Sequence, residues 1–503
     1  MRCGSRLMVL VALFGAGACS STNVRAPGGT GGAPGSGGAD APSGSGGGPA
    51  GTGGMPPGPA PALLQVLSGR FPAADAREIC ADTQLRLTFT VPVAIGQSGK
   101  IQIWKASAPA TPIDTIDAGV PVTEDMIGGR HFYQSRPIFI DGMQAIVYLH
   151  RAAALAPDET YYVTVDSGVF TDPAGATLGE ITSSTDWRFT TRATMVPAAP
   201  DSLVVALDNT GDFCSVQGAI DAIPAANATP VKVTLKNGTY REIVFINNKN
   251  QITLHGEDRK STIIAYANNN ALQSQAPAVG GTANRAMVEV ERSNDLTIEN
   301  LTLHNLTPQG GSQAEAIRIE TSDRAIVRDA DLLSLQDTIL ISGRAYVTNC
   351  YVEGNTDFIW GKGTVYFDKC EIKAVGKKGY NVQARNATSA YGYVFVDSKL
   401  TSSPNLTGHL LARVDGTAYP GSHVAYINCE MGSHIDPTGW LLTNPPADTS
   451  LLRYWEYMSV DPTGAPVDVS KRIAASRQLT ADEAALMRDK ATVFGLPAWN
   501  PTP

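Results

Sequence analysis

Apolar and polar residues alternate in short runs over residues 60–195. The runs are 85–91, 101–104, 145–149, 161–165 and 187–191, and turn-forming stretches such as Asp172-Pro-Ala-Gly175 separate them. Alternation with a period of two predicts strands that bury one face. Short strands at this spacing predict a β-sandwich over residues 60–195.

Several phrases in this segment resemble those of bacterial Ig-like domains. Thr88-Phe89 is followed by Pro92-Val93, and the segment closes on Trp187-Arg-Phe-Thr-Thr191. The segment shows no catalytic constellation in its sequence. The domain is therefore expected to be either a spacer or an accessory binding module.

A different pattern begins near residue 200, where one short phrase recurs. In this phrase apolar residues stand on both sides of a polar residue and a small one. Aligned on the residue after the polar one, it returns at positions 301, 330, 350, 370, 398 and 429. Strand phrases that recur every ~20–30 residues without helices between them predict a solenoid. We therefore predict a parallel β-helix over residues 200–503. A β-propeller is excluded because each blade would need about 40 residues.

Equivalent residues of successive coils should lie about 4.8 Å apart, which is the spacing of neighbouring strands. Cys350 and Cys370 are equivalent, and this spacing lies within the Cα range of a disulfide, so we expect them to be bonded. Two free buried thiols are the alternative. A bridge between Cys80 and Cys214 would clamp the two domains together, but the spacing does not decide this pairing.

Asp337 and Asp357 each stand seven residues beyond the aligned position of their coil. They are therefore expected to stack on one outer face of the β-helix. Two carboxylates so close do not both ionise easily, so one should stay ionised while the other holds a proton near neutral pH. Such a pair suits a nucleophile beside a general acid/base, although two ordinary surface aspartates in turns are the alternative.

The N-terminal residues carry export signals. Arg2 and Arg6 precede an apolar run over 7–14, and small residues lead to Cys19, which predicts a signal peptide over residues 1–18. The run is too short to span a membrane. Cys19 after small residues resembles a bacterial lipobox, although Ala16 replaces the usual large aliphatic residue. We expect lipidation at Cys19 and an outer-membrane or cell-surface lipoprotein; cleavage nearby, giving a secreted protein, is the alternative.

Residues 19–59 are predicted to be a flexible linker. Positions 27–59 contain 15 Gly and 7 Pro, with Asp40 as the only charge. Such a segment cannot build a core, and its mean reach is roughly 30 Å. It is therefore expected to hold the folded domains clear of a membrane, unless it is a low-complexity insertion without a role.

Composition narrows the classes of function. Thirty-nine Lys and Arg against 47 Asp and Glu give a net charge of −8 without a basic run, which argues against nucleic-acid binding. A local cleft can still attract an anionic polysaccharide. The seven Cys are too few for a disulfide scaffold, and no CxxC pair occurs. A monomer is expected because the walls of a β-helix expose no strand edges.

Five phrases, in this order, resemble the signatures of pectin methylesterases, a family of carbohydrate esterases. They are Gly238-Thr-Tyr-Arg-Glu242, Gln313-Ala-Glu-Ala-Ile317, Gln336-Asp-Thr-Ile-Leu340, Asp357-Phe-Ile-Trp-Gly361 and Leu411-Ala-Arg-Val-Asp415. The resemblance runs from about residue 203 to the C-terminal region. It implies an all-β chain whose C-terminal domain is a right-handed parallel β-helix. It also implies hydrolysis of galacturonate methyl esters of pectin to carboxylates and methanol, without a metal or cofactor.

The resemblance also implies a role for each catalytic residue. Asp357 would be the nucleophile and Asp337 the general acid/base. Gln313 and Gln336 would form the oxyanion hole, and Arg413 would orient and stabilise Asp357. The residues expected to bind substrate are Thr239, Tyr240, Trp360 and Asp415, with core packing as the alternative for Tyr240.

Two departures from the family pattern bear on the substrate. Val414-Asp415 stands where the family has Pro-Trp, and Ile341 follows the phrase around Asp337 without an aromatic residue. Fewer aromatic residues and an added carboxylate should weaken the binding of a polyanionic chain. The reaction type is therefore better determined than the substrate.

Two other functions remain open from the sequence. One is an esterase of the same mechanism that acts on another uronate polymer or a thioester, and the other is a non-catalytic β-helix that binds polysaccharide. Serine and zinc hydrolases are disfavoured, because the chain has no G-x-S-x-G or H-E-x-x-H phrase and none of its seven His lies in the five phrases.

Overall fold

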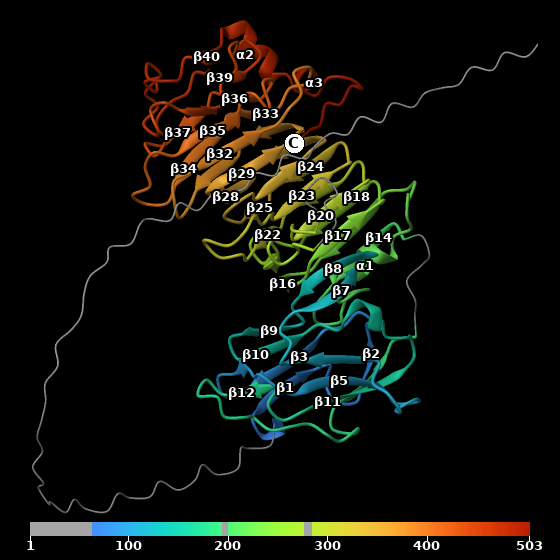
Figure 1. The fold of residues 1–503 in the computed structure, drawn as a ribbon. Coiled ribbons are helices and arrows are strands. Elements are labelled where there is room, and N and C mark those ends of the chain that lie inside the picture. Colours follow the sequence, from blue (N-terminus) through green and yellow to red (C-terminus); the bar gives the residue numbers. More distant parts are fainter. Residues whose placement is uncertain (1–62, 194–199, 276–283, 503) are drawn as a thin grey trace, which may run out of the picture. The chain divides into compact units, whose positions relative to one another are not determined.

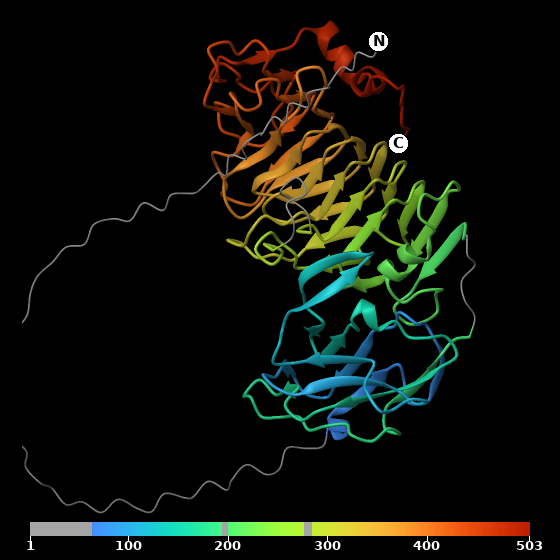
Figure 2. The ribbon, with the colours of Figure 1, turned by 45° about the vertical axis from the view of Figure 1, so that its right-hand side comes forward.

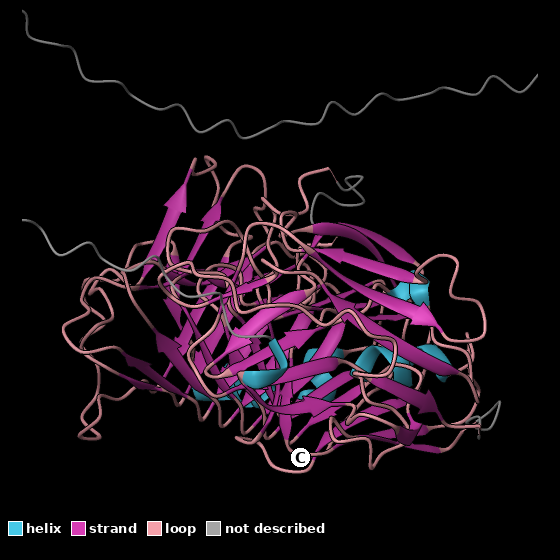
Figure 3. Cartoon of the chain, turned by 90° about the horizontal axis from the view of Figure 1, so that it is seen from below, coloured by secondary structure: helices cyan, strands magenta, loops and turns pink. Residues whose placement is uncertain are grey.

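A computed structural model describes residues 63–193, 200–275 and 284–502, which lie in one compact unit. Strands dominate these residues and helices are few (Figure 3). The predicted signal peptide, the linker and Cys19 lie outside the described residues. Among the helices of the described part, none is both long and apolar enough to cross a membrane.

The first domain is a sandwich of two sheets. The four-stranded sheet has the order β1 (Leu67–Phe71), β3 (Leu85–Phe89), β10 (Gln144–Val147), β9 (Ile138–Asp141). The five-stranded sheet has the order β2 (Ala76–Ile79), β13 (Arg188–Thr191), β11 (Thr160–Val165), β5 (Lys100–Lys105), β6 (Asp114–Asp117). Smaller elements are β4 (Ala94–Ile95) paired with β12 (Phe170–Thr171), β7 (Thr123–Ile127) paired with β8 (Arg130–Ser135), and the 3-10 turns η1 (Leu63–Gln65) and η2 (Arg151–Ala153).

The alternation of the sequence decides which side chains fill the space between these sheets. Strand β3 buries Leu85, Leu87 and Phe89 and turns the two residues between them outward. Strand β11 alternates in the same way. Each run that the sequence pattern predicted as a strand contains one, so the prediction of a β-sandwich is confirmed.

From residue 202 the chain winds into a parallel β-helix with three sheets, whose strands follow one another coil by coil (Figures 1 and 2). The β14 sheet contains β14 (Ser202–Val205), β15 (Val231–Leu235), β18 (Ile252–Gly256), β21 (Thr297–Glu299), β24 (Ala325–Arg328), β27 (Arg344–Thr348), β30 (Thr364–Asp368), β33 (Tyr393–Val396), β36 (His423–Ile427), β39 (Arg453–Tyr457) and β40 (Ser476–Gln478). The β16 sheet contains β16 (Gly238–Tyr240), β19 (Thr262–Tyr266), β22 (Thr302–Asn305), β25 (Asp331–Leu333), β28 (Tyr351–Gly354), β31 (Glu371–Ala374), β34 (Lys399–Ser402) and β37 (Glu430–Met431). The β17 sheet contains β17 (Val244–Asn247), β20 (Val288–Glu291), β23 (Ile317–Glu320), β26 (Ile339–Ile341), β29 (Thr356–Gly361), β32 (Tyr380–Ala384), β35 (Leu410–Asp415) and β38 (Trp440–Thr443). The predicted β-helix is confirmed.

Each recurring phrase of the sequence contains a bend as well as strand residues. The polar residue before the aligned position has a positive φ in every coil: Asn300 (55°), Asp329 (51°), Asn349 (50°), Lys369 (54°), Asp397 (48°) and Asn428 (53°). Asn and Asp tolerate this left-handed conformation better than other residues with a side chain. The bend separates a strand of the β14 sheet from the next strand of the β16 sheet, so the phrase spans two strands.

The expected disulfide between Cys350 and Cys370 is wrong, because both are free, buried thiols. Each donates instead to backbone carbonyls, Cys350 Sγ to Thr348 at 3.3 Å and Cys370 Sγ to Val347 at 3.5 Å. In-register stacking holds equivalent Cβ atoms near the strand spacing of about 4.8 Å, whereas a disulfide needs about 3.5–4.5 Å. A strand spacing of this size lies within the Cα range of a disulfide and above its Cβ range.

A hairpin of the sandwich packs into the core of the β-helix. It consists of β7 and β8, and its turn is Gly128-Gly129 with φ of 56° and 79°, as tight hairpin turns require. Ile127 and Phe132 from this hairpin belong to the same buried cluster as the side chains inside the β-helix. The sandwich and the β-helix therefore share part of one core.

The same hairpin places a cation on the β17 sheet. Arg130 Nη1 donates to Glu289 Oε2 at 2.7 Å, and its guanidinium lies 4.0 Å from the centre of the Phe245 ring. Burial raises the pKa of Glu289 to about 7, although Arg318 and Arg130 oppose the rise. The ion pair compensates the free-energy cost of burying the Glu289 carboxylate, which the hairpin itself helps to bury.

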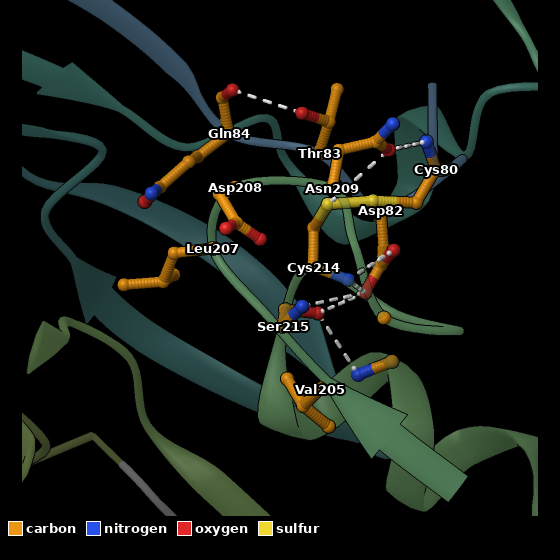
Figure 4. Close-up of a disulfide and its surroundings, with 12 residues drawn as sticks. Cys80, Asp82, Thr83, Gln84, Val205, Leu207, Asp208, Asn209, Cys214 and Ser215 are labelled. Carbon is orange, nitrogen blue, oxygen red and sulfur yellow. Dashed lines mark hydrogen bonds between the residues drawn. A yellow bond between two sulfur atoms is a disulfide. The ribbon is translucent and has the colours of Figure 1, made fainter. Parts of the chain in front are cut away.

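A disulfide between Cys80 and Cys214 also joins the two domains, with a Cα separation of 6.1 Å (Figure 4). Asp82 lies beside it and accepts hydrogen bonds from the backbone N–H of Ser215 at 2.8 Å and from its hydroxyl at 2.7 Å. Ser215 is the N-cap of α1 (Val216–Ala222), and its Oγ accepts from the N–H of Gly218. The bridge that the sequence left open is thus present at the start of the β-helix domain.

The C-terminal segment covers the outer face of the β14 sheet. Helix α2 (Ala481–Arg488) begins with a capping box between Thr480 and Glu483, and α3 (Lys490–Phe494) follows it. Apolar side chains of both helices, including Met487 and Phe494, form a buried cluster with Tyr346 and Tyr366. The β17 sheet has no such cover from these helices and is the wall that carries the site described below.

Removal of the inter-domain disulfide should destabilise the chain. We expect Cys80→Ser/Cys214→Ser to lower the free energy of unfolding by about 2–4 kcal/mol, because the bridge closes a long loop in the unfolded chain. Urea unfolding followed by intrinsic fluorescence measures this. Dithiothreitol should destabilise the parent and leave the double variant unchanged; a parent that is insensitive to reductant would contradict the prediction.

Candidate active site

Outward-facing residues of the β17 sheet form a row across successive coils. Strand register aligns Phe245, Glu289, Arg318, Leu340, Trp360 and Gln383. Val382 pairs with Ala412, which places Arg413 beside Gln383. The β7–β8 hairpin covers the Phe245 end of this row, so the accessible part lies toward Arg413.

Asp337 and Asp357 occupy equivalent positions on neighbouring coils of this wall. Each lies two residues before an isoleucine, and these isoleucines, Ile339 and Ile359, are paired between β26 and β29. Both aspartates have left-handed backbones, with φ of 66° and 48°, and both are buried. A left-handed non-glycine residue typically costs about 1–3 kcal/mol, so the surrounding structure holds each carboxyl group in a defined direction.

The carboxylate of Asp357 is held by a guanidinium and an amide. Arg413 Nε donates to Oδ1 at 2.8 Å and to Oδ2 at 3.1 Å, and Arg413 Nη2 also donates to Oδ2. Gln383 Nε2 donates to Oδ2 at 3.1 Å, while the oxygen of the same amide accepts from Arg385 Nε at 2.9 Å. Arg385 therefore fixes the direction in which Gln383 presents its NH₂ group.

Asp337 has a different set of neighbours. Arg285 Nη2 donates to Asp337 Oδ2 at 2.8 Å and also to Glu315, which Arg285 Nε contacts at 2.9 Å through both carboxylate oxygens. Burial raises the pKa of Asp337 well above its usual value, and the carboxylates of Glu315 and Asp357 raise it further, against Arg285 and Arg385. The protonated form of Asp337 is thus favoured by its surroundings.

Gln313 and Gln336 lie on the coils beside the two aspartates. The backbone of Ala314, next to Gln313, donates to the carbonyl oxygen of Gln336 at 3.1 Å, and Gln336 forms a bridge to Thr356 of the following coil. Both glutamine side chains are half-buried. The backbone therefore places these two residues on coils that adjoin the aspartate pair, and the Gln313 amide oxygen accepts from the Ser312 hydroxyl at 2.9 Å.

Arginine guanidinium groups lie against the faces of aromatic rings in the site. Trp360 is only 7% exposed, and its ring lies 5.2 Å from Arg285 and 4.7 Å from Arg385. Arg413 lies 4.6 Å from the ring of Tyr380. Two cations and burial thus leave little of the Trp360 ring exposed, and its role in substrate binding stays a prediction.

Two other residues expected to bind substrate lie away from the aspartates. Tyr240 is fully buried in the core, where its hydroxyl donates to the carbonyl oxygens of Lys236 at 2.8 Å and Val205 at 3.1 Å, so that expectation is wrong. Its side chain belongs to the buried cluster inside the β-helix. Thr239 precedes it on the β16 sheet, which is a different sheet from the one that carries the aspartates.

Asp415 lies on β35, two residues beyond Arg413. Its carboxylate accepts from the backbone N–H groups of Thr417 at 3.0 Å and Ala418 at 2.9 Å and from Asn444 at 2.8 Å. The hydrogen bond from Ala418, with those from Asn444 and Thr417, lowers the pKa of this exposed group. Its charge is thus engaged in a turn at the end of the strand.

The geometry suits acyl transfer. A carboxylate fixed by Arg413 and Gln383 can act as a nucleophile, a neighbouring carboxyl group whose protonated form is favoured can act as an acid, and glutamine amides can donate to an oxyanion. Family models match the chain in two places: the model described as pectinesterase covers residues 202–491, and the bacterial Ig-like domain covers residues 64–191. The chain belongs to the pectinesterase family. It is therefore a carboxylic ester hydrolase.

Relatives of the pectinesterase domain occur in plants. Pectinesterase 31 of Arabidopsis thaliana is 32% identical over 287 residues, which are 56% of this chain and 88% of the relative. Pectinesterase 2 of Olea europaea is 33% identical over 303 residues, covering 58% of this chain and 78% of the relative.

Solved structures share the fold of the pectinesterase domain. The pectin methylesterase PemA from Erwinia chrysanthemi has a TM-score of 0.50 at 23% identity and covers 61% of this chain and 99% of its own. The pectin methylesterase from carrot has a TM-score of 0.50 at 24% identity with the same coverage, 61% and 99%. At these identities the likeness supports the β-helix fold alone.

The sequence did not predict four polar residues of the site: Arg285, Glu315, Gln383 and Arg385. Glu315 lies inside the phrase that begins at Gln313. It stands 14 residues beyond position 301, the aligned position of its coil, whereas each aspartate stands seven residues beyond the aligned position of its own coil. The loop before β23 lengthens that coil and shifts the offset. The phrase Gln383-Ala-Arg385 lies one coil after Asp357. The repeat of the coils could therefore have predicted that its two polar side chains lie near that aspartate.

The buried position of Tyr240 has a consequence for mutation. We expect Tyr240→Phe to lower the free energy of unfolding by about 1 kcal/mol, because buried carbonyl oxygens lose a donor, and to leave KM for the ester substrate unchanged. Urea unfolding and steady-state kinetics measure the two quantities. A higher KM at unchanged stability would restore Tyr240 to the substrate site.

Proposed function

We propose that this chain hydrolyses the galacturonate methyl esters of pectin through an aspartyl nucleophile. The observation that carries the proposal is the arrangement of Asp357, clamped by Arg413 and Gln383, beside Asp337, whose burial favours the protonated form. Arg285, Arg385 and Arg413 all lie on this wall, where Arg285 pairs with Glu315 and Arg413 with Asp357.

The proposed reaction has two halves. In the first, an Asp357 oxygen attacks the ester carbonyl carbon, Gln313 and Gln336 donate to the oxyanion, and Asp337 gives its proton to the departing methoxide oxygen. Methanol leaves, and an anhydride joins Asp357 to the galacturonate. In the second, Asp337 takes a proton from water as the hydroxide attacks the galacturonyl carbon. The free acid leaves, and Asp357 returns to its ionised form.

Replacement of the nucleophile tests this function directly. We expect the full chain to release methanol from highly methylated pectin, and Asp357→Asn to reduce kcat by at least about 10³-fold. Asp323→Asn, which removes a carboxylate paired with Arg344 outside the site, is the matched control and should retain the parent rate. Equal rates for the parent and Asp357→Asn would refute the assignment. No release by a folded parent would point to a different ester.

We also propose that the enzyme is exported and anchored. The predicted signal peptide over residues 1–18, the expected lipidation of Cys19 and the Gly- and Pro-rich linker together support a surface lipoprotein whose tether holds the catalytic domain clear of the membrane. The edgeless walls of the β-helix favour a monomer. In this arrangement the enzyme contacts pectin outside the cell, and the membrane only through its lipid.

Loss of the anchor should change the fractionation of the protein. Cys19→Ala should move the chain from the membrane to the soluble fraction, because no acylated residue would remain at the start of the tether. Immunoblots of the two fractions after expression in a bacterial host measure this. A variant that stays with the membrane would show that Cys19 is not the anchor.

A further inference from the structure

Three carboxyl groups, rather than two, stack in one column of the β17 sheet. Ile317, Ile339 and Ile359 are paired in register across β23, β26 and β29. Glu315, Asp337 and Asp357 each lie two residues before one of these isoleucines. Neighbouring strands are about 4.8 Å apart, so Asp337 lies between two other carboxyl groups.

The two ends of the column are neutralised and its centre is not. Asp357 receives three contacts from Arg413 and one from Gln383. Glu315, which is fully buried, receives a two-point contact from Arg285. Among the described residues, the one donor to the Asp337 carboxyl group is the Arg285 Nη2 that also serves Glu315.

The charges that face Asp337 come from every neighbouring coil. Arg285 lies before β20, Glu315 before β23, Asp357 at the start of β29, Arg385 after β32 and Arg413 on β35. A cation in contact with a carboxyl group favours its ionised form. Arg285 alone would therefore oppose a general acid at Asp337, whereas Arg285 paired with Glu315 contributes little net charge.

We propose that Glu315 is a positioning residue that neutralises Arg285 and thereby keeps the catalytic proton on Asp337. This inference rests on the proposed function of Asp337 as general acid. Glu315 touches neither substrate nor reacting atoms and acts only through Arg285 and Asp337. Arg285 orients the Asp337 carboxyl group. Its positive charge alone would disfavour the protonated form of Asp337, and the negative charge of Glu315 cancels this effect.

The test is the pH profile of kcat/KM on methylated pectin for the full chain. A general acid must be protonated, so its titration sets the alkaline limb. Glu315→Gln leaves Arg285 charged beside Asp337, and we expect the alkaline limb to move to lower pH by about one to two units. At a pH between the two limbs, kcat/KM should fall by about 10- to 100-fold, while below the variant's limb the rate should approach that of the parent.

The double variant Arg285→Gln/Glu315→Gln separates this role from a merely structural one. It removes both charges, so the alkaline limb should return to within about half a unit of the parent. If Glu315 only supported the packing of the coil, the double variant would be at least as impaired as the single one, with an unmoved limb in both. That result would overturn the proposal.

A matched control breaks a buried ion pair elsewhere. Glu456 and Arg472 pair at 2.8 Å, with Glu456 fully buried. Glu456→Gln should lower the unfolding midpoint without moving the alkaline limb. A shift in this control equal to that of Glu315→Gln would show that the limb reports stability, and would overturn the proposal.

An optical measurement keeps the inference testable without substrate. Infrared spectra of the parent minus those of Asp337→Asn isolate the C=O stretch of the protonated carboxyl, and its loss with rising pH titrates Asp337. We expect the same titration in Glu315→Gln at a pH lower by one to two units. Absence of methanol release with a shifted infrared titration would refute the proposed function and support this inference; an unshifted titration would overturn it.

Discussion

In-register stacking of coils at a single strand spacing is the constraint on which this structure depends. Side chains at equivalent positions of successive coils lie about 4.8 Å apart whatever their chemistry, because the backbone hydrogen bonds set the distance. Inside the coils this gives columns of apolar side chains and stacked rings such as Phe367 and Phe395. At the bend it gives the column that contains Cys350 and Cys370, which are near neighbours and remain unbonded.

On the outer wall the same constraint forces carboxyl groups together. A column of Glu315, Asp337 and Asp357 would repel itself strongly in a dry environment, and the chain compensates with guanidinium groups at its two ends, Arg285 and Arg413. The compensation is uneven, because Asp357 receives three contacts from Arg413 whereas Asp337 shares Arg285 with Glu315, and burial raises the pKa of Asp337. The chemistry of the site thus follows from an electrostatic problem that the fold itself creates.

The sandwich domain is coupled to the β-helix by more than the chain connection. Phe132 of its hairpin enters the β-helix core, Arg130 pairs with Glu289, and Cys80 is bonded to Cys214. The hairpin covers the first strands of the β17 sheet, so the accessible part of the row lies toward Arg413. A spacer without further role would need none of these contacts, so the domain also shapes the wall on which the site lies.

The sequence by itself determined the β-sandwich, the β-helix and the two aspartates, because each depends on a local period: two residues within a strand, and 20 residues between Asp337 and Asp357. It did not reveal Glu315, since a longer loop shifts its offset, or Arg285, which lies two coils before Asp337 outside any quoted phrase. It also misplaced Tyr240 and predicted a bond between Cys350 and Cys370. These outcomes depend on the direction of a side chain and on angstrom differences between Cβ atoms. Only the packed tertiary structure decides them, because hydrogen bonds and burial from distant parts of the chain fix those directions.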